Sequence, residues 1–180
     1  MSTLVRPGFV VWLTGLPSSG KTTLAHALGR LLAERGIDAA LLDSDELRRR
    51  LTPNPTYSDE ERDGFYRTLA ILAELLAAHG VNVLIAATAP KREHRQAARD
   101  RIGRFVEVHV DCPPEECRAR DPKGLWRRAD RGEIATLPGA GAPYEAPEAP
   151  EVRIDTSRRP VDAAARDILE QLDAQGFLAP

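Results

Sequence analysis

The chain has 180 residues, a length that fits one globular domain and leaves little room for a second. Hydrophobic residues make up 42% and charged residues 29%, a balance that excludes collagen-like, disulfide-rich and wholly disordered chains. The 25 Lys and Arg residues are balanced by 27 Asp and Glu residues, giving a net charge of −2. Because a binder of duplex DNA normally carries a basic excess, no nucleic-acid partner is expected.

Targeting and redox signals are also absent from the sequence. No apolar run approaches the roughly 18–20 residues that cross a bilayer, so no membrane partner is expected. The segment 1–8 contains one Arg and lacks the layout of a signal peptide. Cys112 and Cys117 have no second Cys/His pair nearby, which argues against a zinc site and predicts reduced cysteines. These features predict a cytoplasmic protein.

Short apolar runs alternate with stretches of helical periodicity along the chain. The runs predict strands at 9–13, 39–42, 81–87, 105–110 and 152–155. Helices are expected after the first strand up to Gly36, and at 45–51, 58–80, 91–102, 113–120 and 161–172. Such alternation implies right-handed crossovers. We therefore predict one α/β domain over residues 1–180, with a parallel sheet of about five strands and helices on both faces.

Residues 121–150 break this alternation. The segment is first charged and then rich in Gly and Pro, and it contains too little apolar material for a second domain. Long segments of this kind in compact domains commonly cover a functional site. We expect a lid.

A phosphate-binding loop follows the first strand. Residues 15–22 read GLPSSGKT and match G-x-x-x-x-G-K-[ST], between a buried strand and a helix as a P-loop requires. Backbone N–H groups of such a loop and the following helix N-terminus point at phosphate oxygens. Lys21 is expected to contact the β- and γ-phosphates of ATP, and Thr22 to supply a hydroxyl to Mg²⁺. The predicted nucleotide-binding residues are Gly15, Leu16, Pro17, Ser18, Ser19, Gly20, Lys21, Thr22 and Thr23.

The second strand ends in two carboxylates, Asp43 and Asp45. Asp43 is expected to orient Mg²⁺ or an attacking hydroxyl. Asp45 has two interpretations, a cap for the next helix or a contact to substrate. Arg48, Arg62 and Arg67 lie on the two helices that follow, and one or more of them can hold a substrate anion. The GTPase motif N-K-x-D is absent, which favours a kinase.

Several segments occur in the order seen in adenylylsulfate (APS) kinases, and the sequence resembles that family over nearly its whole length. They are the loop at 15–22, LDSDELR at 42–48, 57–62, RDPKGLW at 120–126 and APYEAP at 142–147. The resemblance implies transfer of the γ-phosphoryl group of ATP to the 3′-hydroxyl of APS, giving PAPS and ADP. It implies Lys21, Asp43 and Lys123 as catalytic residues, and Thr22 and Asp43 at the metal. The substrate-binding set that it implies is Asp43, Asp45, Arg48, Tyr57, Arg62, Lys123 and Leu137.

The sequence departs from this family's pattern at five positions. Ser44 replaces a glycine, Phe65 an asparagine expected to touch substrate, and Ala89 a serine sometimes assigned as a phosphorylated intermediate. Leu137 replaces a phenylalanine that stacks on the adenine of APS, and Tyr57 replaces its aromatic partner. The nucleotide half of the site is therefore kept and the acceptor half altered.

Three functions remain open at this stage. The leading one is an Mg²⁺-dependent APS kinase. The second is a related P-loop kinase acting on another hydroxyl-bearing metabolite, and the third is an ATP-binding regulatory module without phosphotransfer. The resemblance is compatible with a homodimer and with a separate ATP sulfurylase, since none is fused to this chain.

Overall fold

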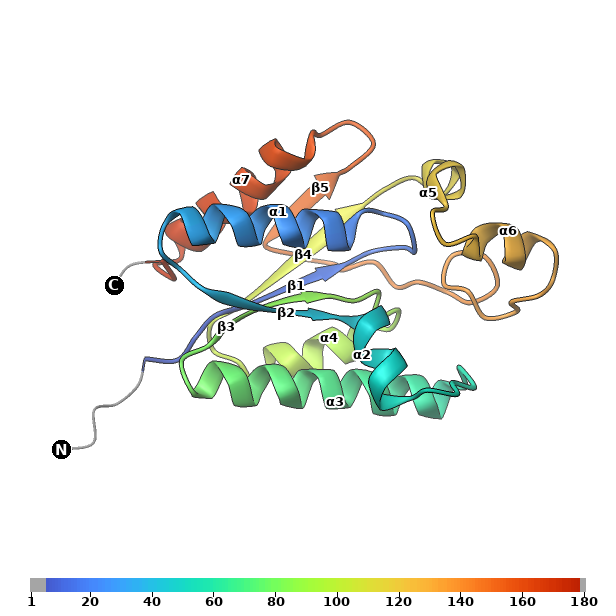
Figure 1. Cartoon of the computed structure of the whole chain (residues 1–180), viewed down its shortest axis with the longest axis horizontal. Coiled ribbons are helices and arrows are strands. Elements are labelled where there is room, and N and C mark those ends of the chain that lie inside the picture. Colours follow the sequence, from blue (N-terminus) through green and yellow to red (C-terminus); the bar gives the residue numbers. More distant parts are fainter. Residues whose placement is uncertain (1–5, 179–180) are drawn as a thin grey trace.

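Five apolar runs of the sequence lie side by side as one parallel sheet in the computed structural model, which describes residues 6–178 (Figure 1). The expectation of no signal peptide therefore lies mostly outside the described residues. The order of the strands is β2-β3-β1-β4-β5, so β1 is central, and Val11 pairs with Leu84 on one side and Val106 on the other. The strands are β1 (Val10–Thr14), β2 (Ala39–Asp43), β3 (Asn82–Ala86), β4 (Phe105–Asp111) and β5 (Val152–Asp155).

Helices cover both faces of the sheet, as predicted (Figure 1). On one face lie α1 (Lys21–Glu34) and α7 (Val161–Ala174), and on the other α3 (Asp59–Ala78) and α4 (Arg92–Arg99). Each layer has its own core, with Leu13 and Leu28 in the first and Trp12 and Leu69 in the second. The helices beyond the carboxyl ends of the strands are α2 (Ser44–Leu51), α5 (Pro114–Arg120) and α6 (Leu125–Asp130). None of the helices within residues 6–178 is long and apolar enough to cross a membrane.

The long helix α3 starts where the predicted capping signal places it. The Ser58 hydroxyl accepts a hydrogen bond from the Glu61 backbone N–H at 3.2 Å. Glu61 does not complete the reciprocal half of a capping box, because its Oε2 accepts from the Thr56 N–H at 2.6 Å and from the Thr56 hydroxyl at 2.7 Å. Glu61 thereby fixes the loop before α3 and keeps its other oxygen available for α2.

The lid segment 121–150 contains the helix α6, which the sequence analysis did not predict. The Asp121 carboxylate caps this helix by accepting from the backbone N–H groups of Trp126 at 3.1 Å and Arg127 at 3.0 Å. Trp126 is fully buried, and its indole N–H donates to the Pro17 carbonyl at 3.0 Å. The lid is thus an ordered unit that rests on the P-loop.

Both ends of the lid are fastened to the sheet. At its start, Arg120 Nη2 donates to the Thr156 carbonyl at 2.8 Å, and Thr156 donates to the Ser19 carbonyl. At its end, the Glu145 N–H donates to the Pro90 carbonyl at 2.8 Å. The segment is therefore bounded by contacts to β5 and to the loop after β3.

A buried arginine connects the end of the lid segment to the sheet. Arg95 is 2% exposed and donates to Glu107 Oε1 at 2.6 Å, to the Glu145 carbonyl at 2.7 Å and to the Ala89 carbonyl. Because a buried charge needs a partner and filled hydrogen-bonding positions, these contacts make the arginine compatible with its site. One side chain thus connects α4, β4 and the end of the lid segment.

Candidate active site

The predicted phosphate-binding loop joins β1 to α1. Gly15 lies so close to the Val110 carbonyl oxygen that a Cβ there would approach it to 2.3 Å, so only glycine fits. Gly20 has φ +98° and stands at the N-cap of α1, where it offers no side chain to cover the first N–H groups of the helix. These N–H groups and the helix dipole are therefore free to interact with an anion that binds in the loop.

Lys21 folds back over the loop. Its Nζ donates to the carbonyl oxygens of Gly15 at 3.0 Å and Leu16 at 2.8 Å. Burial lowers the pKa of Lys21 to about 8, with the nearby Asp45 carboxylate opposing the shift. A phosphate would reverse this desolvation cost, because it supplies the negative charge that the buried ammonium lacks.

Asp43 uses its two carboxylate oxygens for two purposes. Oδ2 accepts from the Thr22 hydroxyl at 2.7 Å, and Oδ1 accepts from the N–H groups of Asp45 at 2.9 Å and Glu46 at 3.2 Å. Burial raises the pKa of Asp43, but these hydrogen bonds outweigh it and hold the pKa below its ordinary value. Two hard oxygen donors from β2 and the P-loop therefore meet beside Lys21, and this donor set suits Mg²⁺.

Asp45 does not cap α2, contrary to one of its two interpretations, because Asp43 is the N-cap. It forms an ion pair with Lys123 of the lid, and both side chains are more than half exposed. Ser44 lies in the first turn of α2 with an ordinary helical backbone, so the loss of glycine there has no structural cost. The pair links the lid to the helix that carries Arg48.

Arg62 lies in the first turn of α3 and also holds the lid. Its Nη2 donates to the Thr136 carbonyl at 2.6 Å and hydroxyl at 3.0 Å, and its Nε donates to the Tyr57 carbonyl at 3.1 Å. Thr136 was not predicted as a site residue, and no motif in the sequence marks it. Arg67, one turn further along, is exposed.

Arg48 points into a group of aromatic rings. Its guanidinium carbon lies 3.9 Å from the ring centroid of Phe65 and 5.3 Å from that of Tyr57. Nη1 donates to Glu61 Oε1 at 3.2 Å, and the Arg48 side chain is 11% exposed. Glu61 was predicted only as a helix cap, so its contact with Arg48 is new.

Leu137 lies inside the lid's own apolar cluster. It is 6% exposed and packs with Trp126, Cys112 and Cys117. The cysteines are free, one following β4 and one on α5 as predicted. Of the predicted substrate-binding residues, the structure therefore gathers Asp43, Asp45, Arg48, Tyr57, Arg62 and Lys123 around α2, α3 and the lid, and buries Leu137 away from solvent.

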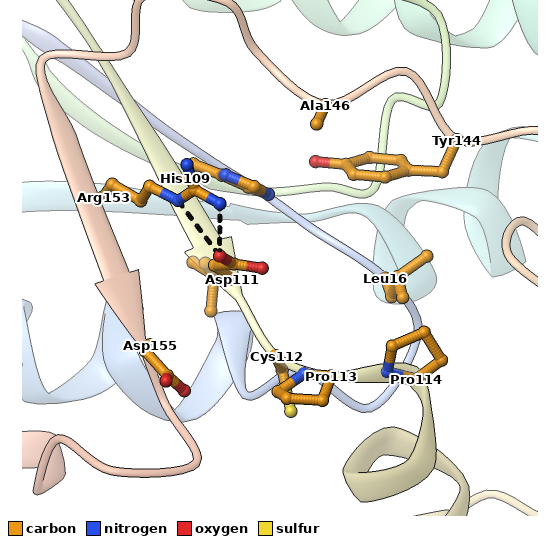
Figure 2. A pocket seen from close by; sticks show the side chains of 11 residues that line it. Leu16, His109, Asp111, Cys112, Pro113, Pro114, Tyr144, Ala146, Arg153 and Asp155 are labelled. Carbon is orange, nitrogen blue, oxygen red and sulfur yellow. Dashed lines mark hydrogen bonds and ion pairs between the residues drawn. The ribbon is translucent and has the colours of Figure 1, made fainter.

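A cavity of about 250 Å³ opens beside the P-loop, at the carboxyl ends of β4 and β5 (Figure 2). Leu16 contributes from the loop, and Tyr144 and Ala146 from the end of the lid segment. On its charged wall Arg153 donates to Asp111 Oδ2 through Nε at 3.0 Å and Nη2 at 2.8 Å, and Asp155 adds a second carboxylate. Burial lowers the pKa of His109 on the same wall, which favours neutral imidazole. The cavity has no excess positive charge, so phosphate binding belongs to the P-loop.

The sequence profile of the family described as adenylylsulphate kinase matches residues 7–155. The chain belongs to the adenylylsulphate kinase family. An adenylyl-sulfate kinase of Picosynechococcus sp. is 41% identical over 173 residues, which are 96% of this chain and 98% of the relative. That of Paraburkholderia xenovorans is 44% identical over 170 residues, which are 94% and 95% of the two chains.

A solved member of the adenylylsulphate kinase family shares the fold closely. The APS kinase of Mycobacterium tuberculosis, solved in complex with AMPPNP and APS, is 38% identical and covers 93% of this chain and 99% of its own, with a TM-score of 0.88. The fold predicted from the sequence, a P-loop α/β domain with a parallel sheet, is confirmed.

Proposed function

We propose that this protein is an adenylyl-sulfate kinase, which transfers the γ-phosphoryl group of ATP to the 3′-hydroxyl of APS to give PAPS and ADP. The observation that carries the proposal is the near-complete match, at TM-score 0.88, to a kinase solved with AMPPNP and APS. The junction of Lys21, Thr22 and Asp43 at the P-loop supports it, because phosphoryl transfer needs these groups at one point.

The donor half of the reaction falls to the P-loop. Its backbone N–H groups and the N-terminus of α1 hold the phosphates of ATP, and Lys21 neutralises charge on the β- and γ-phosphate oxygens. Thr22 and Asp43 are the proposed ligands of Mg²⁺, which when bound supplies further neutralisation of the phosphates. Catalysis by these groups is mainly positioning and charge stabilisation.

Residues of α2, α3 and the lid carry out the acceptor half of the reaction. The 3′-oxygen of APS forms a bond to the γ-phosphorus while the bond from phosphorus to the β,γ-bridging oxygen breaks, and ADP leaves with that electron pair. The ionised Asp43 carboxylate orients the acceptor hydroxyl and receives its proton late, because the transition state is loose and a carboxylate of low pKa is a weak base. Lys123, which lies in the lid, is placed to stabilise the negative charge of the phosphoryl group during its transfer.

The remaining site residues bind the acceptor. We propose that Arg48 and Arg62 bind the phosphosulfate of APS, with Asp45 and Tyr57 beside them, and that residues 121–150 act as the lid of one kinase domain spanning 1–180. Arg62, Lys123 and Asp45 already join the lid to α2 and α3, which supports closure over a bound acceptor. Leu137 would contact APS only through a rearrangement of the cluster around Trp126.

We also propose a cytoplasmic protein that assembles as a homodimer and receives APS from a separate ATP sulfurylase. An apolar pair on the outer face of α3, Ile71 at 39% and Leu75 at 53% exposure, supports a subunit contact. The chemistry supports a supply of APS by another active site, because APS contains a phosphosulfate anhydride that the proposed kinase reaction does not form.

The test is release of ADP from ATP and Mg²⁺ with APS and with a panel of other hydroxyl-bearing acceptors, the product being identified by chromatography. We expect rapid turnover with APS and formation of PAPS. The variant Lys21→Ala is expected to lose about 10³-fold or more in rate while unfolding at the same temperature. Preferential use of another acceptor would favour the related-kinase interpretation, and nucleotide binding without turnover on any acceptor would favour the regulatory one.

A further inference from the structure

Phe65 occupies a position where the sequence analysis expected an asparagine in contact with substrate, and the structure gives it a different neighbour. The ring is 5% exposed and lies under the guanidinium of Arg48, with 3.9 Å between the guanidinium carbon and the ring centroid. Tyr57 and Tyr66 stand around the same guanidinium at 5.3 Å and 6.0 Å. We call Tyr57, Phe65 and Tyr66 the aromatic cage.

The cage and Glu61 constrain Arg48 in complementary directions. The Phe65 ring supports the flat face of the guanidinium, where the electron-rich ring attracts the cation. Glu61 accepts from one edge at 3.2 Å, in the plane of the N–H donors. A face contact and an edge contact together fix both the position and the plane of the group.

Arg48 needs such support because of its place in the fold. It lies in the last turn of α2, a short helix with no fully buried residue that contacts the core through the partly buried Leu47. A free arginine loses rotamer entropy when an anion orders it, and a pre-ordered one does not. The plane of the guanidinium decides whether it can form two parallel hydrogen bonds to an oxyanion.

We propose that Phe65 is a positioning residue, which holds the guanidinium of Arg48 ready for the phosphosulfate of the acceptor. This inference rests on the proposed function, since it takes Arg48 as a ligand of APS. Phe65 acts through the guanidinium that lies over its ring. Its effect is on binding of the acceptor, so it changes the KM for APS and leaves the KM for ATP and kcat close to their original values.

The test compares Phe65→Leu, which keeps most of the buried volume and removes the π face, with Phe65→Tyr, which keeps that face. Loss of a desolvated cation–π contact predicts a rise of about three- to thirty-fold in the KM for APS in Phe65→Leu and near-original values in Phe65→Tyr. Phe105→Leu is the matched control. Phe105 is 6% exposed and its ring centroid lies 5.0 Å from the guanidinium carbon of Arg99, but it is the first residue of β4, at the opposite end of the strands from the P-loop.

Repeating the substitution in an Arg48→Met variant separates the positioning of Arg48 from a general packing role of Phe65. In the Arg48→Met variant, Phe65→Leu is expected to add no further change in the KM for APS, because the group that it positions is gone. An equal rise in both backgrounds would overturn the inference, and so would an unchanged KM for APS in Phe65→Leu. A joint loss of kcat and ATP affinity, matched by Phe105→Leu, would also overturn it by showing a structural role. Failure of the unaltered protein to phosphorylate APS would instead reject the proposed function.

Discussion

Thr22 and Asp43 are joined by a 2.7 Å hydrogen bond from the threonine hydroxyl to Oδ2 of the carboxylate. The two residues are 21 positions apart in the sequence, and the contact brings the end of β2 against the first turn of α1. Because Oδ1 separately caps α2, an exchange of partners at Oδ2 leaves the start of that helix intact. The site can therefore accept a ligand without disturbing the helix that carries Arg48.

The ionisation of Lys21 predicts how the rate depends on pH. Burial lowers its pKa from 10.5 to about 8, so the free enzyme loses the positive charge as the pH rises through about 8. Since kcat/KM reports ionisations of the free enzyme, kcat/KM for ATP is expected to fall above that pH. Lys21→Arg should remove this fall in kcat/KM, because arginine stays charged over the whole pH range. A kcat/KM profile that stays flat to pH 10, or the same fall in Lys21→Arg, would show that the ammonium is not the titrating group.

Transfer is expected to be direct, without a phosphorylated enzyme. Ala89 stands where a serine would be needed for such an intermediate, and it is fully buried. Incubation with γ-labelled ATP alone should leave no label on protein after denaturation, and a chiral γ-phosphoryl group should be inverted on transfer to acceptor. Ala89→Ser serves as the comparison, and it too should carry no label. Stable label on any side chain of the unaltered protein would reject direct transfer.

Leu137→Phe is expected to strain the lid. Leu137 is 6% exposed against Trp126 and the two cysteines, so a larger ring overfills the cluster at a cost of about 1–3 kcal/mol. Chemical denaturation measures that cost, and steady-state kinetics measures the KM for APS. A ring that instead stacked on the adenine would tighten the KM by up to about tenfold without loss of stability. That result would place residue 137 against substrate in the working enzyme.

Arg95 is expected to stabilise the fold far more than its exposed neighbour Arg92. Arg95→Leu leaves Glu107, 8% exposed, without its main partner, which predicts a loss of about 3–5 kcal/mol in the free energy of unfolding. Arg92→Leu removes an exposed ion pair with Glu148 and should cost at most about 1 kcal/mol. Urea denaturation of both variants makes the comparison. Similar small losses would mean that water replaces the buried partner.

The parts of the structure that the sequence predicted well are those governed by local pattern. The run from β1 through the P-loop into α1 combines a buried strand, obligatory glycines and a periodic helix, and each signal lies within a few residues. The cap of α3 was similarly local, since Ser58 and the Glu61 N–H are three positions apart. Pattern recognition therefore located the nucleotide half of the site before any tertiary contact was known.

The parts that the sequence did not predict depend on distant contacts. Helix α6 is short and polar, and it is held by burial of Trp126 on the P-loop rather than by periodicity. The choice of Asp43 over Asp45 as the cap of α2 depends on where the backbone enters the helix, and a shift of two residues decides it. The burial of Leu137 and the stacking of Arg48 on Phe65 are contacts between different elements, so no residue spacing in the sequence predicts them.

The fastening of the lid at both ends restricts its mechanics. Arg120 is held at Thr156 and Glu145 at Pro90, so a rearrangement that keeps these contacts is confined to the polypeptide between them. Gly124, at φ +66°, lies just inside the first anchor and is held there by hydrogen bonds to Asp121 and Arg128, whereas a Cβ at Gly139 would strike Leu16 at 2.7 Å. Any opening of the lid that keeps both anchors must therefore take place within residues 121–144, while Thr156 and Pro90 stay beside the sheet.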